Sequence, residues 1–369
     1  MSPVREKRRL AAQWWFWLVL GAGLLGLMML EWRLCRAFPA VSAACRTAAQ
    51  AVSSVLSRIA GLFPFPLSEW IIAALILGWG GWLVVTLFRR RWKALPLGLC
   101  RLVCFGCAAA FLFVALYGVH HTAPTLASQM GLTVEQYTPA QLEVFFADVV
   151  EQVNALAPRV PRDSDGRCAF GDFRELARQV SAEYISIKAE YPVFDRPRAG
   201  LVKRSLLGGR IMSYIDLAGY YFPWAAESTV SSDVVQSHIP FDIAHETAHG
   251  LGIGPEAECN FSAWLVCKDS ADLRLQYSGW LCAYVYAGNA LHAADYEGWL
   301  LQASSLCDEA KLDLRVLNES LARFADTKAN QIGSAANDAL IKATGQSDGI
   351  RSYGKVVDLM LAYFYEYNE

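Results

Sequence analysis

Three long stretches without a charged side chain constrain this chain more than any other feature of its sequence. They are residues 14–30, 70–88 and 102–119, and each contains 17 to 19 residues. Since an α-helix rises about 1.5 Å per residue, each stretch is long enough to cross a hydrocarbon layer of roughly 30 Å. We therefore predict a membrane domain over residues 1–119, with three transmembrane helices at about 14–31, 70–88 and 102–119.

The first stretch has a second interpretation, because four basic residues between positions 5 and 9 precede it, as in a secretory signal. Its apolar run is long for a signal core, however, and no cleavage pattern of small residues precedes Glu31 and Trp32. We therefore expect a retained anchor.

Lysine and arginine in the short loops predict the orientation of the spans. Four precede the first span and five lie within the 13 residues 89–101, whereas the 38 residues 32–69 contain only four. The dense clusters predict a cytoplasmic N-terminus and place residues from about 120 onward outside. Two structures fit residues 40–62: an amphipathic helix on the outer membrane surface, with Arg46, Gln50 and Arg58 toward water, or a plain solvated helix.

Composition excludes one class of partner. The formal net charge is −2, so the chain lacks the basic surface that nucleic-acid binding needs, and we expect no nucleic acid among its partners. Five of the ten cysteines precede residue 120 and five follow it, and no Cys-x-x-Cys pair lies in the outer part. A cysteine zinc knuckle is therefore not indicated, while a disulfide such as Cys282 to Cys307 stays open.

Residues 120–369 are sufficient for one two-lobed extracytoplasmic domain. Residues 138–157 and 173–190 have apolar residues at helical spacing, and 199–236 mixes glycine, serine, tyrosine and β-branched residues as in strands and turns. Helical patterns return after 237 and continue to the end. The predicted fold class is α+β, mostly helical, with a small sheet ahead of the helix described next.

Residues 243–261 contain the pattern that carries chemistry, IAHETAHGLGIGPEAECNF. Pro240 suits the first turn of a helix, so His245 and His249 lie one turn apart on the same face, as two ligands of one tetrahedral Zn²⁺ would. Glu246 lies beside His245, where a carboxylate can act as general base on a zinc-bound water. We therefore predict a zinc site with Glu246 as the catalytic base.

The third metal ligand is expected from the segment after the turn. Gly252 and Gly254 can adopt positive φ and Pro255 starts a new helix, so the chain doubles back and brings a glutamate to the metal. We choose Glu256, because Asn260 one turn later can then hydrogen-bond a ligand imidazole or carboxylate. Glu258 is the alternative ligand. Cys259 is expected to be a small buried residue.

These residues resemble the gluzincin metallopeptidases, in which HExxH is followed by Glu-x-x-x-Asp, with Asn260 here in place of the aspartate. The chain is also similar to the bacterial family catalogued as domain of unknown function 3810, through the segments LYGVHHTAP (116–124), GYYFPWAAES (219–228), PFDIAHETAHGLGI (240–253), EAECNF (256–261) and the stretch 337–364. The resemblance implies a zincin-like metallopeptidase domain anchored in the bacterial cytoplasmic membrane.

Zincins commonly bind substrate along the edge of a sheet that precedes the active helix, and residues 226–231 are the candidate edge, with Glu227, Ser228 and Thr229 within it. Glu227 either meets a substrate amine or is a solvated charge. Tyr353 and Tyr286 are the candidates for stabilising the transition state as hydrogen-bond donors.

Two hypotheses follow. The first is a zinc metallopeptidase that hydrolyses cell-envelope or membrane-proximal polypeptides, with a peptide or protein substrate and the lipid bilayer as partners. The second is a non-catalytic sensor or assembly scaffold that zinc only stabilises. Because the outer domain begins directly after the third span, with His120 and His121 at the exit, we expect the cleft to lie close to the membrane helices.

Overall fold

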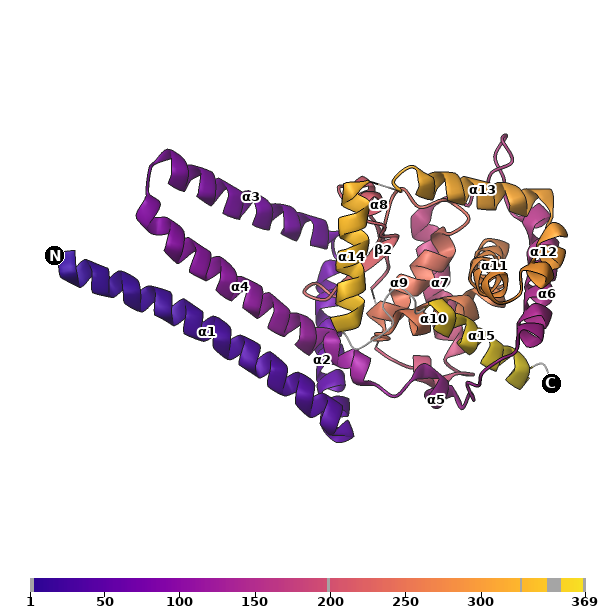
Figure 1. The fold of residues 1–369 in the computed structure, drawn as a ribbon, viewed down its shortest axis with the longest axis horizontal. Helices are drawn as coiled ribbons and strands as arrows, with labels where there is room; N and C mark the ends of the chain where they lie inside the picture. The colour runs from indigo at the N-terminus through magenta and orange to yellow at the C-terminus, as the bar shows by residue number, and fades with distance from the viewer. Residues whose placement is uncertain (1–2, 198–199, 326, 344–352, 368–369) are drawn as a thin grey trace.

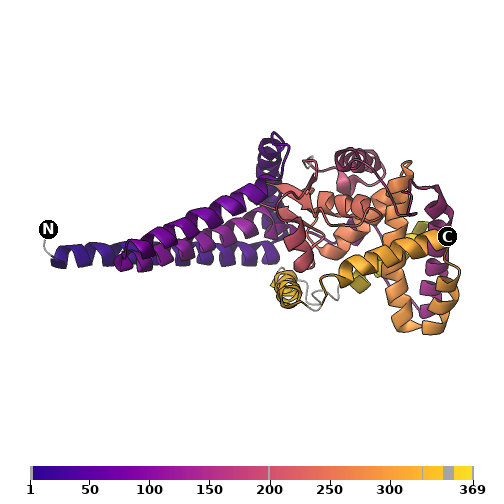
Figure 2. The ribbon, with the colours of Figure 1, turned by 90° about the horizontal axis from the view of Figure 1, so that it is seen from above.

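The computed structural model describes residues 3–197, 200–325, 327–343 and 353–367. Helices predominate, and one three-stranded sheet accompanies them. Three long helices project from one side of a globular part, and the N-terminus lies at the far end of the projection (Figures 1 and 2). The predicted combination of three N-terminal apolar helices with a mostly helical remainder and a small sheet is therefore confirmed.

The projecting helices are α1 (Pro3–Ala37), α3 (Leu67–Phe88) and α4 (Leu95–Leu116). Within them, three segments are long and apolar enough to cross a membrane: Gln13–Ala37, Leu67–Phe88 and Trp92–Leu116. Large apolar side chains cover their outer surfaces; Leu77 is 74% and Phe88 89% exposed. In water such a surface is unfavourable, but it matches a hydrocarbon environment.

The third candidate span begins earlier and ends earlier than predicted. Pro96 lies in the first turn of α4, where its missing N–H costs nothing, and the helix continues through Arg101 to Leu116. The charge-free criterion had placed the start at 102. Arg101 is accommodated because its guanidinium lies over the ring of Trp17 on α1, with 5.6 Å from Cζ to the ring centroid.

The helix α2 (Pro39–Ala60) packs against the ends of α1 and α4 and contacts the globular part. Lys203 of the globular part donates to the carbonyl of Ala60 at 2.8 Å. Arg46 does not extend into water as predicted, because it donates to Ser42 Oγ and to the carbonyl of Thr122. The helix is therefore a packed layer between the projecting helices and the globular part rather than a solvated helix.

The sheet contains β1 (Lys203–Arg204), β2 (Gly219–Phe222) and β3 (Glu227–Val230), in the order β1-β3-β2. Strand β3 pairs in parallel with β1 and antiparallel with β2. The prediction that residues 226–231 form a substrate-binding edge is therefore wrong, since both sides of β3 already have partners. The region 199–236 also contains the short helix α8 (Gly209–Tyr214), which the residue composition did not indicate.

The remaining helices largely follow the predicted pattern. Helices α6 (Pro139–Leu156, with a Thr138/Gln141 capping box) and α7 (Phe173–Ile187) match the two expected ahead of the sheet. The others are η2 (Gly118–Thr122), α5 (Leu126–Met130), α9 (Ile239–Gly250), α10 (Glu256–Lys268), α11 (Leu273–Ala294), α12 (Tyr296–Ser304), α13 (Asp308–Ala322), α14 (Lys328–Ala343) and α15 (Tyr353–Tyr367). All ten cysteines are free, so no Cys282–Cys307 disulfide is formed.

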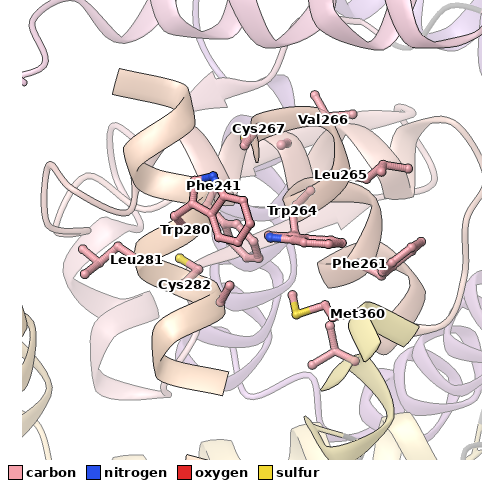
Figure 3. Close-up of a cluster of buried hydrophobic side chains, with 14 of the residues drawn as sticks. Phe241, Phe261, Trp264, Leu265, Val266, Cys267, Trp280, Leu281, Cys282 and Met360 are labelled. Atoms are coloured by element: carbon pink, nitrogen blue, oxygen red, sulfur yellow. The ribbon is translucent and has the colours of Figure 1, made fainter. Parts of the chain in front are cut away.

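The core lies where α9, α10, α11 and α15 meet, and Figure 3 shows Phe241, Phe261, Trp264, Trp280 and Met360 converging there. Trp264 is edge-on to Trp280, with 5.8 Å between ring centroids. Because α10 is covered on several sides, eleven of its residues are buried. This packing fixes α10 against α9, the two helices that carry the predicted site.

Two buried carboxylates attach α3 to the globular part. Glu227 on β3 accepts hydrogen bonds from the backbone N–H groups of Leu67 and Ser68, each at 3.0 Å, and from the Lys203 ammonium at 2.6 Å. Glu69 on α3 in turn accepts from the backbone N–H groups of residues 206–208. Glu227 thus caps the positive end of α3, and neither prediction for it, a substrate contact or a solvated charge, was correct.

Candidate metal centre

The chain reverses between α9 and α10 as the sequence predicted. Gly252 has a φ of +81°, in the left-handed region that glycine tolerates, and the N–H of Ile253 bonds back to the carbonyl of Ala248 at 3.0 Å. Any side chain at 252 would also meet the His120 ring, because a Cβ there would lie 2.9 Å from His120 Cε1. Pro255 then precedes α10 in extended conformation.

This reversal brings His245, His249 and Glu256 together. The two Nε2 atoms are 3.1 Å apart, Glu256 Oε2 is 3.2 Å from His245 Nε2, and Glu256 Oε1 is 3.5 Å from His249 Nε2. Two ligands at about 2.0 Å from a tetrahedral zinc lie about 3.3 Å apart, so these separations match the edges of a zinc tetrahedron.

The opposite ring nitrogens determine which tautomer each histidine adopts. His245 Nδ1 is 2.7 Å from Asn260 Oδ1, and His249 Nδ1 is 3.1 Å from the carbonyl oxygen of Ile253. When each Nδ1 donates to its neighbouring oxygen, it carries the hydrogen and the Nε2 of that ring presents a lone pair. In that tautomer two lone pairs and a carboxylate face one another. A metal ion fits this donor set.

The electrostatics agree with the geometry. Burial lowers the pKa of His245 and of His249, but the Glu256 carboxylate more than offsets it, so both pKa values lie above the ordinary 6.5. For Glu256 the two effects have the opposite sign. Burial raises the pKa of its carboxyl, but the two histidines lower it by more and hold it well below its usual range. The site therefore favours a bound cation.

Glu246 lies next to this cluster and is 4% exposed. Burial raises the pKa of its carboxyl to about 8; His245 opposes the shift, and the nearby acids Glu256 and Asp242 add to it. Its Oε2 atom has no hydrogen-bond partner within the described part of the chain. A buried carboxylate oxygen without a partner is uncommon, and here it leaves an acceptor free for a water or substrate group.

Two neighbours position Glu246. Ser228 on β3 donates from Oγ to the backbone carbonyl of Glu246 at 2.7 Å, which holds the centre of α9 against the sheet. On the other side lies Gly219 of β2, where a Cβ would collide with the Glu246 carboxylate. Glycine at 219 therefore makes room for the carboxylate next to the strand.

Tyr117, at the end of α4, is a site residue that the sequence analysis missed. Its hydroxyl is 3.0 Å from His249 Nδ1 and 3.4 Å from the carbonyl oxygen of Gly254. Burial raises the pKa of Tyr117 well above 10, so its hydroxyl stays neutral and can donate to the Gly254 carbonyl. Tyr117 is the second residue of the segment LYGVHHTAP, but nothing within that segment pointed to a contact with His249. Since α4 is a candidate membrane span, the histidine and glutamate cluster lies next to the end of one of these helices.

The structure separates the other candidates. Glu258 accepts from the backbone N–H of Leu126 at 3.0 Å and does not join the histidines. Cys259 is buried as expected, with its Sγ 3.2 Å from His249 Nδ1. Tyr353 begins α15, but its side chain lies outside the described part of the structure, and Tyr286 packs on Phe241 with 6.1 Å between ring centroids.

The substrate-edge residues are engaged elsewhere. The side chains of Glu227, Ser228 and Thr229 are buried, and β3 is paired on both sides. Their predicted role in binding substrate by main-chain pairing is therefore wrong. The outer strand next to Glu246 is β2, which pairs with β3 alone among the described strands.

Fold and site together define a class: a helical protein with three apolar helices, one of which ends beside a cluster of two histidines and a glutamate suited to a metal ion. The chain belongs to the family described as protein of unknown function DUF3810, whose model matches residues 46–361. The match includes α3, α4 and the cluster. No curated protein and no solved structure matches the chain.

Proposed function

We propose that this protein is a membrane-anchored zinc metallopeptidase of the gluzincin type. One observation carries the proposal: two imidazoles with opposed Nε2 lone pairs and one carboxylate converge beside a second, buried carboxylate with an unpartnered oxygen. The first three groups suit a metal ion, and the fourth suits a general base. The positive-charge pattern supports a cytoplasmic N-terminus and a catalytic domain outside the bacterial cytoplasmic membrane.

In this proposal His245, His249 and Glu256 hold Zn²⁺. When bound, the metal supplies Lewis acidity, which polarises a peptide carbonyl and makes a water more acidic. Glu246 takes the proton of the attacking water at Oε2 and returns it to the leaving amine. Its raised pKa of about 8 suits a group that must both accept and release a proton.

Hydrogen bonds to the far side of each ring keep the ligands in place. Asn260 accepts from His245 Nδ1–H, and the Ile253 carbonyl accepts from His249 Nδ1–H. Such contacts fix ring orientation and raise ligand basicity. Tyr117 packs on the same side of His249 and couples the end of α4 to the centre.

The substrate is proposed to be a polypeptide of the cell envelope close to the membrane. The support is the position of the cluster at the end of α4, which limits reach to chains near the bilayer surface. With β3 excluded, the outer side of β2 is the strand edge next to Glu246 for main-chain pairing with a peptide.

The competing hypothesis is a scaffold that zinc stabilises without catalysis. Such a protein needs His245, His249 and Glu256 but gains nothing from Glu246. A buried carboxylate with an unpartnered oxygen costs stability, so its presence favours the peptidase.

The test compares the full-length protein in detergent with three variants. His249→Ala should lose one equivalent of zinc in elemental analysis. Glu246→Gln should retain zinc and the wild-type melting temperature but lose cleavage of an unstructured polypeptide such as casein. Glu258→Gln is the matched control, because Glu258 lies on the same helix turn as Glu256 and binds Leu126 instead.

Two outcomes contradict the proposal. Equal zinc content in the wild type and His249→Ala would remove the metal centre. Zinc-dependent wild-type cleavage that persists undiminished in Glu246→Gln would remove the assigned base, and a zinc-loaded wild type without hydrolytic activity would favour the scaffold.

A further inference from the structure

A groove of about 600 Å³ opens where α1, α2 and η2 meet, next to the candidate metal centre. Its lining includes Trp32, Arg36, Ser42, Arg46, His121 and Thr122. The proposed function uses none of these side chains.

The groove carries two guanidinium groups, and the Glu31 carboxylate lies near Cys35, which also lines the groove. Arg46 is held in one orientation by neutral acceptors, Ser42 Oγ at 2.6 Å and the carbonyl oxygen of Thr122 at 3.2 Å. Arg36 lies over the Trp32 ring, with 5.8 Å from Cζ to the centroid. Neither arginine forms an ion pair with any residue that the structure describes. Their charges are therefore oriented toward the groove and available to an anion.

The start of α2 adds to the positive character of the groove, and His121 adds polar atoms without a partner. Helix α2 begins at Pro39 with no acidic residue in its first turn and no side-chain cap, and Pro39 lines the groove. The positive end of the helix dipole is therefore not neutralised. Both ring nitrogens of His121 are buried and have no hydrogen-bond partner within the described chain.

The position of the groove identifies the source of the anion. Arg36 lies in the last turn of α1, and Trp32 lies one turn earlier, at the end of the candidate span Gln13–Ala37. Tryptophan and arginine at the end of a span mark the level of lipid headgroups. On the same face of α1, three residues before Trp32 and seven before Arg36, Met29 is 57% exposed and offers an apolar surface to an acyl chain.

We propose that this groove binds the phosphate of an anionic membrane lipid. Arg36 and Arg46 bind the phosphate oxygens, the start of α2 adds its dipole, and Met29 of α1 contacts an acyl chain. The site is separate from the metal ligands and does not require peptidase activity. Because His121 packs against Gly254, where a Cβ would lie 3.0 Å from the ring, a bound lipid would also lie beside the turn that carries Glu256.

The test measures lipid binding to the full-length protein by native mass spectrometry, with phosphatidylglycerol against phosphatidylcholine in the same detergent. The wild type should retain one phosphatidylglycerol in preference. Arg36→Gln and Arg46→Gln should each weaken that binding on the order of tenfold, the loss expected for a charge-assisted hydrogen bond. Matched controls are Arg33→Gln on α1 and Arg58→Gln on α2, which do not line the groove.

Three results would overturn the proposal. The first is equal binding of the two lipids, and the second is an equal loss in the control variants, which would show a general charge effect. The third is displacement by millimolar glycerol 3-phosphate, which would show that a free phosphate and not a lipid is the ligand. Arg46 also donates to the Thr122 carbonyl, so the Arg46→Gln result counts only if the melting temperature of the variant is unchanged. Arg36 makes no such bond, so Arg36→Gln tests the lipid site without this structural effect.

Discussion

The hydrogen bond between Asn260 and His245 gives the sharpest prediction about the metal centre. The change is Asn260→Ala. Asn260 Oδ1 lies 2.7 Å from His245 Nδ1, and Asn260 is 6% exposed, so water does not easily replace the lost acceptor. The imidazole N–H would be left without a partner, and the ring would lose the contact that fixes its orientation.

The expected magnitude follows from that burial. An unsatisfied buried donor costs about 1–3 kcal/mol, and a tenfold change in affinity corresponds to about 1.4 kcal/mol. Loss of such a supporting contact typically weakens metal binding about 10–100-fold, which agrees with this range. We therefore expect the zinc dissociation constant of Asn260→Ala to rise by about 10–100-fold.

The assay is a competition titration of zinc between the full-length protein and a chelator of known affinity at fixed pH. Asn260→Asp is the conservative variant: it restores an acceptor of the same size and should bind zinc at least as tightly as the wild type. Asn318→Ala, at an exposed position on α13, is the control for nonspecific effects. A wild-type zinc affinity in a folded Asn260→Ala protein would refute the reasoning.

Three further predictions follow from the same contacts. In Gly219→Ala the added Cβ collides with the Glu246 carboxylate, so peptidase activity should fall at least about tenfold while zinc content is retained. The control is Gly106→Ala, which should change neither measurement because the space around Gly106 is open. Glu227→Ala leaves the buried Lys203 ammonium unpaired and should cost about 3–5 kcal/mol of unfolding free energy in denaturant titration, against under about 1 kcal/mol for Lys188→Ala in an exposed pair. Because zinc must displace protons from two imidazoles whose pKa values lie above 6.5, zinc affinity should rise with pH through and above that value and then level off; a flat profile between pH 5 and 8 would contradict the assigned ligands.

Local patterns predicted much of this protein. The charge-free stretches gave the three apolar helices, because length and hydropathy alone decide whether a helix suits a bilayer. The i, i+4 spacing of His245 and His249 and the glycine at 252 gave the two neighbouring imidazoles and the reversal to Glu256. Asn260 followed from the same reasoning, since helical periodicity places it one turn beyond Glu256.

Contacts between distant segments were not predictable in this way. Tyr117 lies 132 residues before His249, and nothing in its local pattern distinguishes it from a tyrosine at a membrane boundary. Glu227 was assigned to a substrate edge because strand composition does not show which strand is central. Its actual partners, Leu67, Ser68 and Lys203, come from two other parts of the chain.

The sequence by itself determined the three apolar helices, the start and end of α9, and the residues around the turn that can ligate a metal. These properties depend on helical periodicity, proline and glycine positions, and charge within a few residues. Only the tertiary structure decided the strand order, the capping of α3 by Glu227 and the contact between Tyr117, after α4, and His249. The physical reason is that each depends on which buried polar group finds its partner across the packed interface, a choice that no local pattern encodes.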